Sequence, residues 1–203
     1  MVPPFDIQPV LTGKKVILRP LVEADYDALF AVASDPDIWA MHPFRDRYKS
    51  EVFIPFFADA IKSRGAFAII DRASGDMIGG TRFANYVADT NEIEIGWTFF
   101  GTAYWRSGAN REVKALMLRY IFEFVRTVVF QIGAHNFRSR TAVERLGGRC
   151  VDTHKREHDG QLHDYTTYHL TREDALRGVL AGIPLTQLSR PAAIAAPVAE
   201  VLA

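Results

Sequence analysis

This sequence has little cysteine, no net charge and no long apolar run. The only cysteine among 203 residues is Cys150, which excludes an internal disulfide and any zinc or iron–sulfur site built from several cysteines. The 24 Lys and Arg balance the 24 Asp and Glu, so bulk electrostatics give no reason to expect nucleic acid or an anionic membrane as a partner. No stretch approaches 18 uninterrupted apolar residues, and residues 1–6 lack the features of a signal peptide. We therefore expect a cytoplasmic protein that neither spans a membrane nor is exported.

Hydrophobic residues make up 48% of the chain, which is enough for one large core. A chain of this size buries roughly 70% of the surface that its unfolded form exposes, so it needs neither disulfides nor a structural metal for stability. No repeat of 20 to 50 residues is visible, which excludes solenoids and propellers.

Strand-like and helix-like patterns alternate along the chain and predict a mixed α/β domain from about Gly13 to Leu170. The expected order is β-α-α-β-β-β-α-β-α-β-β. Strands are expected at 16–21, 66–71, 77–83, 91–99, 128–134, 149–156 and 163–170. Helices are expected from Glu23 to a stop at 34–37, from Ser50 onward, over the apolar stripe from Val113 to Phe124, and over 136–146. The helix that begins at Ser50 is expected to bury one side, formed by Ile54, Phe57, Ala58 and Ile61. Residues 171–203 are rich in Ala and Pro and predict a helix to about Ala181 followed by a loose tail.

The strand expected at 91–99 carries two carboxylates on one face. Glu92 and Glu94 alternate with Ile93 and Ile95, which point to the other face. Gly96 then interrupts the pattern, and a glycine inside a strand often marks a bulge or the close approach of a ligand.

The segment from Tyr104 to Glu112 joins that strand to the long helix and contains Gly108. A tight turn before a helix presents unpaired backbone N–H groups and the positive end of the helix dipole to one point, which suits a phosphate. The Gly-Lys-Ser/Thr of a P-loop and the three-glycine spacing of a dinucleotide fold are both absent. The alternative is that Gly108 simply makes a turn.

Three segments in this order carry a resemblance to a known family: Ile95-Gly96-Trp97, then 104–110, then Asn136-Phe137-Arg138-Ser139 leading to 144–147. Together they resemble the GNAT superfamily of acetyl-CoA-dependent N-acetyltransferases, and within it the RimJ/RimL-like branch. The resemblance covers residues 13 to about 170. It implies the GNAT fold with a splayed central sheet, and acetyl-CoA as co-substrate.

The resemblance also implies which residues contact the cofactor. The pyrophosphate would lie on the amides of 106–111, and the pantetheine arm would add to the bulged strand as an extra strand, where an amide would also stabilise the oxyanion. Two departures from the superfamily pattern are Trp105, where Gln or Arg usually opens the loop, and Asn110, where a second glycine is usual. The cofactor residues so implied are Trp97, Thr98, Phe99, Trp105, Arg106, Ser107, Gly108, Ala109, Asn110, Arg111, Asn136 and Ser139.

Acetyl transfer needs a base for the amine and an acid for the departing thiolate. Glu94 is the preferred base because it is nearer the bulge than Glu92, although both could simply be solvated on an open sheet face. Many GNAT enzymes place a Tyr in the fourth helix as the acid, but Val143 stands at that position here. Ser139 is the local substitute, unless its hydroxyl only bonds its own helix backbone. Asn136 most simply caps the helix.

The six histidines show no zinc spacing, so no metal is expected, and Cys150 is expected to pack within its strand. The aromatic segment from Trp39 to Tyr48 is either core or a lid over the acceptor. The resemblance implies a primary amine as acceptor: a protein N-terminus, as in the RimJ/RimL-like branch, is the first hypothesis, and a small-molecule amine is the alternative. A CoA-binding protein without transferase activity is the rival hypothesis, and a third hypothesis makes residues 171–203 an arm that docks on a second subunit to give a homodimer.

Overall fold

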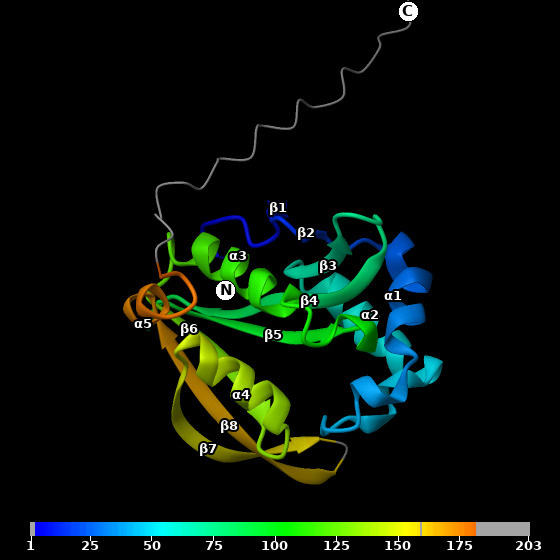
Figure 1. The fold of residues 1–203 in the computed structure, drawn as a ribbon. Coiled ribbons are helices and arrows are strands. Elements are labelled where there is room, and N and C mark those ends of the chain that lie inside the picture. Colours follow the sequence, from blue (N-terminus) through cyan, green and yellow to red (C-terminus); the bar gives the residue numbers. More distant parts are fainter. Residues whose placement is uncertain (1–2, 159, 182–203) are drawn as a thin grey trace, which may run out of the picture.

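The computed structural model describes residues 3–158 and 160–181, and an eight-stranded mixed sheet forms its centre (Figure 1). The strand order is β1-β2-β3-β4-β5-β6-β8-β7, and every neighbouring pair is antiparallel except β5 and β6. The strands are β1 (Leu11–Thr12), β2 (Val16–Pro20), β3 (Ala66–Asp71), β4 (Met77–Val87), β5 (Glu92–Phe100), β6 (Thr127–Gly133), β7 (Arg149–His158) and β8 (Gln161–Thr171).

Helices cover both faces of this sheet. The helices are α1 (Tyr26–Ala33), α2 (Ser50–Lys62), α3 (Ala109–Ile121), α4 (Phe137–Leu146) and α5 (Arg172–Arg177), with short 3-10 turns η1 (Glu23–Asp25), η2 (Pro36–Ile38), η3 (Arg45–Tyr48) and η4 (Thr102–Tyr104). Helices α1 and α2 pack against Ala66 and Ala68 of β3 and Phe99 of β5. Helices α3 and α4 belong to the other core, which contains Ile93 and Ile95. Phe99 and its neighbour Phe100 lie in different cores, because successive side chains of a strand point to opposite faces.

The predicted order of elements is confirmed, with one short strand, β1, added before it. The predicted hairpin is also confirmed, since β7 and β8 pair up to His158 and Gln161. The predicted face of α2 is partly wrong: Phe57 is buried as predicted, but Ile54 is 53% exposed and Ala58 is exposed, and Phe53 and Ala60 are buried in their place. Spacings of three and four residues fit either stripe, and only the position of the sheet decides between them.

Two helix ends also differ from the predictions. Helix α3 ends at Ile121, and Phe124 beyond it is 38% exposed. The helix expected to reach Ala181 ends at Arg177. The expected tail over 182–203 lies outside the described residues.

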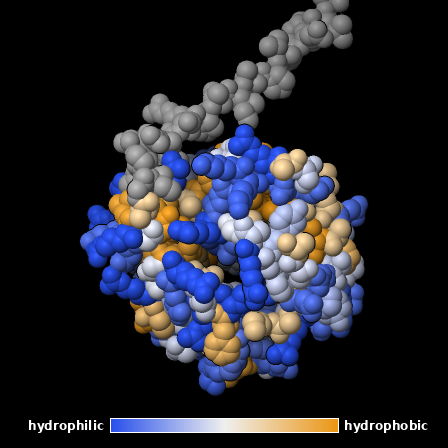
Figure 2. All heavy atoms as spheres, viewed as in Figure 1, coloured by the Kyte–Doolittle hydropathy of each residue, from blue (hydrophilic) through white to orange (hydrophobic). Residues whose placement is uncertain are grey.

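The two parallel strands at the centre of the sheet separate after a short contact. Strand β5 pairs with β6 only from Glu92 to Glu94, opposite 127–129. Beyond that point β5 continues beside β4, and β6 continues beside β8. Among the described strands none covers the freed edge of β5, so its backbone N–H and C=O groups are open to an extended ligand. Figure 2 shows a hollow near the middle of this face, where Figure 1 places β5 and α4.

Candidate functional site

A bulge distorts β5 where the strand leaves β6. Gly80 pairs with Phe99 but Arg82 pairs with Gly96, so β5 contains one residue more than β4 between these pairs. Trp97 has a φ of 52°, a left-handed conformation that is uncommon for any residue except glycine. The bulge expected around Gly96 is therefore present, and Trp97 adopts its left-handed conformation.

The loop before α3 has the geometry of an anion site. Gly108 is the N-cap of α3 and has a φ of 88°, which only glycine adopts without strain. The Ser107 Oγ accepts the N–H of Ala109 at 3.2 Å. Within the part of the chain that the structure describes, no acceptor pairs with the N–H groups of Gly108, Asn110 or Arg111. These three donors and the helix dipole favour a negatively charged group.

The turn between β1 and β2 holds this loop in place. The carboxylate of Glu112 accepts the backbone N–H groups of Lys14 at 2.6 Å and Lys15 at 2.9 Å, and the Lys15 Nζ donates to the carbonyl of Ser107 at 2.7 Å. A cavity of about 380 Å³ lies beside the loop, and the charged side chains in its lining are Lys14, Lys15, Arg72 and Asp71. Positive charge therefore exceeds negative charge next to the free amides.

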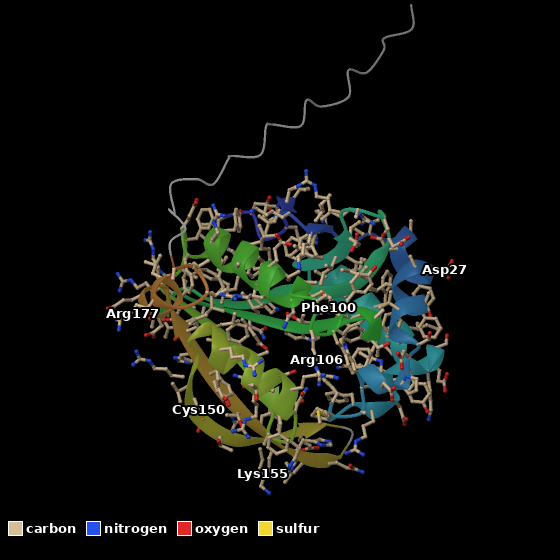
Figure 3. The ribbon with its side chains drawn as sticks, in the orientation of Figure 1. Asp27, Phe100, Arg106, Cys150, Lys155 and Arg177 are labelled. Carbon is tan, nitrogen blue, oxygen red and sulfur yellow. The ribbon has the colours of Figure 1, made fainter. Side chains whose placement is uncertain are left out.

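Trp105 and Arg106 connect β5 to this loop. The Trp105 Nε1 donates to the carbonyl of Phe100 at 3.2 Å, and the guanidinium of Arg138 lies 4.1 Å from the Trp105 ring centroid. Arg106 is exposed, has a φ of 61° and lies near the gap between β5 and α4 (Figure 3). The Asn110 Oδ1 is buried with no hydrogen-bond partner among the described residues, so Asn110 holds a spare acceptor beside the loop.

The two carboxylates on β5 have different surroundings. Glu94 is 8% exposed, and its Oε2 accepts a hydrogen bond from Asn85 Nδ2 at 2.7 Å. Burial raises the pKa of Glu94, and the hydrogen bond from Asn85 and the charges of Arg156 and Arg82 only partly oppose this rise. Glu92 is half-buried at the end of the strand, where it accepts from Thr90 Oγ1 at 3.0 Å. The burial and raised pKa of Glu94 suit a proton acceptor.

Helix α4 places Asn136 and Ser139 beside the splayed strands. The Asn136 Oδ1 accepts the backbone N–H of Ser139 at 3.2 Å, which confirms the predicted cap. Ser139 is half-buried, and Val143 and Leu146 lie in the core below it. The inward stripe predicted for this helix is therefore present, with Ser139 at its N-terminal end.

Several polar residues near Glu94 were missed by the sequence analysis. Arg82 of β4 is 3% exposed, and its guanidinium carbon lies 4.5 Å from the ring centroid of Trp97. Arg47, in the connection between α1 and α2, is half-buried among aromatic rings. Trp39 from the same connection is 3% exposed and contacts Phe99, so it belongs to the core. No local pattern in the sequence indicates that the side chains of Arg47 and Arg82 are buried.

Lys114 of α3 is a second buried cation that the sequence did not reveal. Its Nζ donates to Thr98 Oγ1 at 2.6 Å and to Thr81 Oγ1 at 3.3 Å. No carboxylate pairs with it in the described ranges, and burial lowers its pKa from 10.5 to about 7. Lys114 therefore joins α3 to β4 and β5 at the bulge.

The described residues contain no group of three or more His, Cys, Asp or Glu side chains that could hold a metal ion. None of the helices in the described part of the chain is long and apolar enough to cross a membrane. Cys150 was expected to pack in its strand, but it is exposed on β7, at the edge of the sheet (Figure 3).

Comparisons with known proteins agree on the family. Residues 15–149 match the family described as Acetyltransferase (GNAT) domain. A search of curated protein sequences gives no significant match. A GCN5-related N-acetyltransferase from Brucella melitensis is 27% identical, with a TM-score of 0.72 over 82% of this chain and 80% of that one.

Two further structures are similar in fold at lower identity. A GNAT-family acetyltransferase from Bacillus anthracis is 20% identical, with a TM-score of 0.68 over 81% of this chain and 99% of that one. Mycobacterium smegmatis RimJ, solved in complex with CoA-disulfide, is 18% identical, with a TM-score of 0.64 over 81% of this chain and 85% of that one. The matched residues include the bulged strand, the amide-rich loop and α4, and the chain belongs to the GNAT acetyltransferase family.

Proposed function

We propose that this protein transfers the acetyl group of acetyl-CoA to a primary amine by direct attack, with Glu94 accepting the proton of the amine. The observation that carries this proposal is the buried Glu94 carboxylate, three residues from the Trp97 bulge and next to the uncovered edge of β5. The reaction requires a base close to the amine and an open strand edge that positions the thioester beside them.

The residues of the loop and of β5 fit acetyl-CoA. The free N–H groups of Gly108, Asn110 and Arg111 would hold its pyrophosphate, and the open edge of β5 from Trp97 to Phe99 would hold the pantetheine arm. Acetyl-CoA, when bound, supplies a thioester carbonyl that an amine can attack. The protein's own part is to orient the reactants, exclude water and move protons.

Glu94 makes the amine reactive by removing a proton from its ammonium form. An ammonium ion has no lone pair, so attack requires this transfer. Burial brings the pKa of Glu94 closer to working pH, while Arg82 and Arg156 favour its ionised form. The Asn85 amide fixes the carboxylate through Oε2 and leaves Oε1 for the proton.

Ser139 is the proposed donor to the departing sulfur, because Val143 cannot act as an acid. We expect Ser139→Ala to lower kcat about 10- to 100-fold, since a hydrogen bond to a charged group contributes about 1.5–3 kcal/mol. The affinity for acetyl-CoA, measured by calorimetry, should change by less than about threefold. Thr141→Ala, at an exposed position of the same helix, is the matched control. Equal kcat in both variants would assign Ser139 a structural role only.

Binding of acetyl-CoA is the first test of the proposed function. Calorimetric titration should give micromolar affinity, about −8 kcal/mol. Gly108→Trp should abolish it, because a side chain at this positive φ strains the loop and fills the space over the amides. A folded wild-type protein that does not bind acetyl-CoA would refute the proposal. Binding without acetylation of any amine would instead support a CoA-binding protein without transferase activity.

The acceptor is a protein N-terminus or a small-molecule amine. The likeness to RimJ supports a common fold, and its 18% identity carries no argument about the acceptor. The side chains that surround Glu94 are a better guide.

A further inference from the structure

Arg82 is a buried guanidinium whose hydrogen bonds are incomplete. Its Nη1 donates to Asp59 Oδ2 at 2.7 Å, while its Nε and Nη2 are buried with no partner among the described residues. These two nitrogens lie on one edge of the guanidinium plane, so their N–H groups form the parallel pair that matches the two oxygens of a carboxylate. A buried donor without an acceptor costs free energy that a bound anion would offset.

Arg47 brings a second positive charge to the same region. Its guanidinium carbon lies 4.4 Å from the ring centroid of Phe56 and 4.6 Å from that of Phe44, and its Nη1 is 3.4 Å from His42 Nε2. Within the described ranges Arg47 forms no ion pair. Burial lowers the pKa of Arg47 to about 10; Tyr165 and Asp59 oppose this change, and the charge of Arg82 adds to it. Burial also lowers the pKa of His42 well below 6.5, so His42 is neutral.

Arg82 acts directly on the proposed base, and Arg47 is connected to the same region through Arg82 and Tyr165. The charges of Arg82 and Arg156 act on Glu94, and those of Arg47, Arg156 and Glu94 act on Tyr165. Three arginines therefore face the carboxylates of Glu94 and Asp59, and the Asp59 side chain is 66% exposed. An amine with no acidic group would bring a further positive charge into this region, whereas one that carries a carboxylate would balance it.

We propose that Arg47 and Arg82 bind a carboxylate of the acceptor, so that the acceptor is a free amino acid. This proposal rests on the transferase function proposed above and names its substrate class. A cavity of about 10 Å³ lined by Arg82, Trp97 and Phe56 is too small for a carboxylate, so one of these aromatic rings must shift on binding.

The test compares acceptors that differ only in the carboxylate. Alanine, leucine, phenylalanine and lysine are each paired with the corresponding decarboxylated amine, and peptides supply free N-termini. Release of CoA thiol measures kcat/KM for each. In a second arm that needs no turnover, CoA-saturated protein is titrated calorimetrically with each N-acetyl amino acid and with the matching N-acetyl amine.

We expect at least one amino acid to have a kcat/KM about 10- to 100-fold above that of its decarboxylated amine, and its N-acetyl product to bind tighter by the same factor. This is the range of a charge-assisted bidentate pair. Arg82→Lys keeps the charge but loses the paired N–H groups, and Arg47→Met removes the second charge. Each should reduce the preference at least tenfold. Arg45→Met removes an exposed charge from the same 3-10 turn and should leave the preference unchanged. Melting temperatures identify any variant that fails to fold. If Arg82→Lys does not fold, Arg47→Met still tests the proposal.

Three results would overturn the inference: equal use of amino acids and decarboxylated amines, acetylation of peptide N-termini but not of amino acids, or equal binding of the two kinds of product. In each case the acetyl-CoA titration still decides the proposed function separately. If that titration shows no binding of acetyl-CoA, the proposed transferase function itself is refuted.

Discussion

Replacing Glu94 with glutamine is expected to lower kcat by about 10²- to 10⁴-fold, the usual contribution of a general base. Glutamine has the same shape, and its amide oxygen can still accept the hydrogen bond from Asn85. It cannot accept a proton. The dissociation constant for acetyl-CoA should stay within about twofold of the wild-type value, because the cofactor residues are unchanged. Steady-state kinetics and calorimetry measure the two quantities.

The pH dependence of kcat/KM distinguishes a base from a residue that only packs. In the wild-type protein the acidic limb should lie above pH 4.5, the ordinary pKa of glutamate, because burial raises the pKa of Glu94. Glu94→Gln should lose this limb. Glu92→Gln is the matched control and should keep both the limb and most of the rate. If Glu92→Gln loses activity and Glu94→Gln keeps it, the base is Glu92.

Stability should change in the opposite direction to activity. A carboxyl group whose pKa is raised by folding contributes stability that is present below its unfolded pKa and is lost as pH rises through the folded pKa. At pH 8, wild-type Glu94 is therefore a buried charge that opposes folding. We expect Glu94→Gln to be at least as stable as the wild type there, by urea unfolding. A large loss of stability would show that the side chain is needed for packing.

The pH dependence of stability should carry a large contribution from Lys114. Its pKa is about 7 in the folded protein against 10.5 in the unfolded chain, so between these values the unfolded state holds the proton that the folded state has lost. Unfolding free energy therefore rises with pH in this interval, by about 1.4 kcal/mol per pH unit at most. From pH 7 to pH 9 the gain is expected to be about 2 to 3 kcal/mol. Below pH 7 Lys114 is protonated in both the folded and the unfolded state, and the free-energy cost of burying its charge is then at its maximum.

Lys114→Met isolates this contribution. Methionine has a similar length and no charge, and Thr81 and Thr98 keep their mutual hydrogen bond at 2.8 Å. We expect the variant to be more stable than the wild type at pH 6.5 and to lose the rise between pH 7 and pH 9. Lys62→Met, at an exposed position in α2, should keep the wild-type slope. Urea unfolding at half-unit pH steps measures all three proteins. Identical slopes in wild type and Lys114→Met would show that Lys114 is charged throughout this range.

The order of elements and the loop before α3 could be predicted from local sequence patterns. Strand and helix periodicities are local, as are the signals of Gly108 and Asn136 at helix ends, so they can be recognised without knowing what packs against them. Gly96 indicated the bulge for the same reason. Alternation placed Glu92 and Glu94 on one face of β5 but could not say which was buried.

Which polar side chains become buried depends on contacts between distant segments of the chain. Lys114 is buried because Thr81 and Thr98, from two strands far away in the sequence, meet α3. Arg82 is buried because the Trp97 ring covers it and Asp59 of α2 reaches it from the other side. Likewise, α2 buries Phe53 and exposes Ile54 because of where the sheet lies. Burial depends on the summed contacts of distant segments, which no local pattern records, and burial sets the charge state and chemistry of these groups.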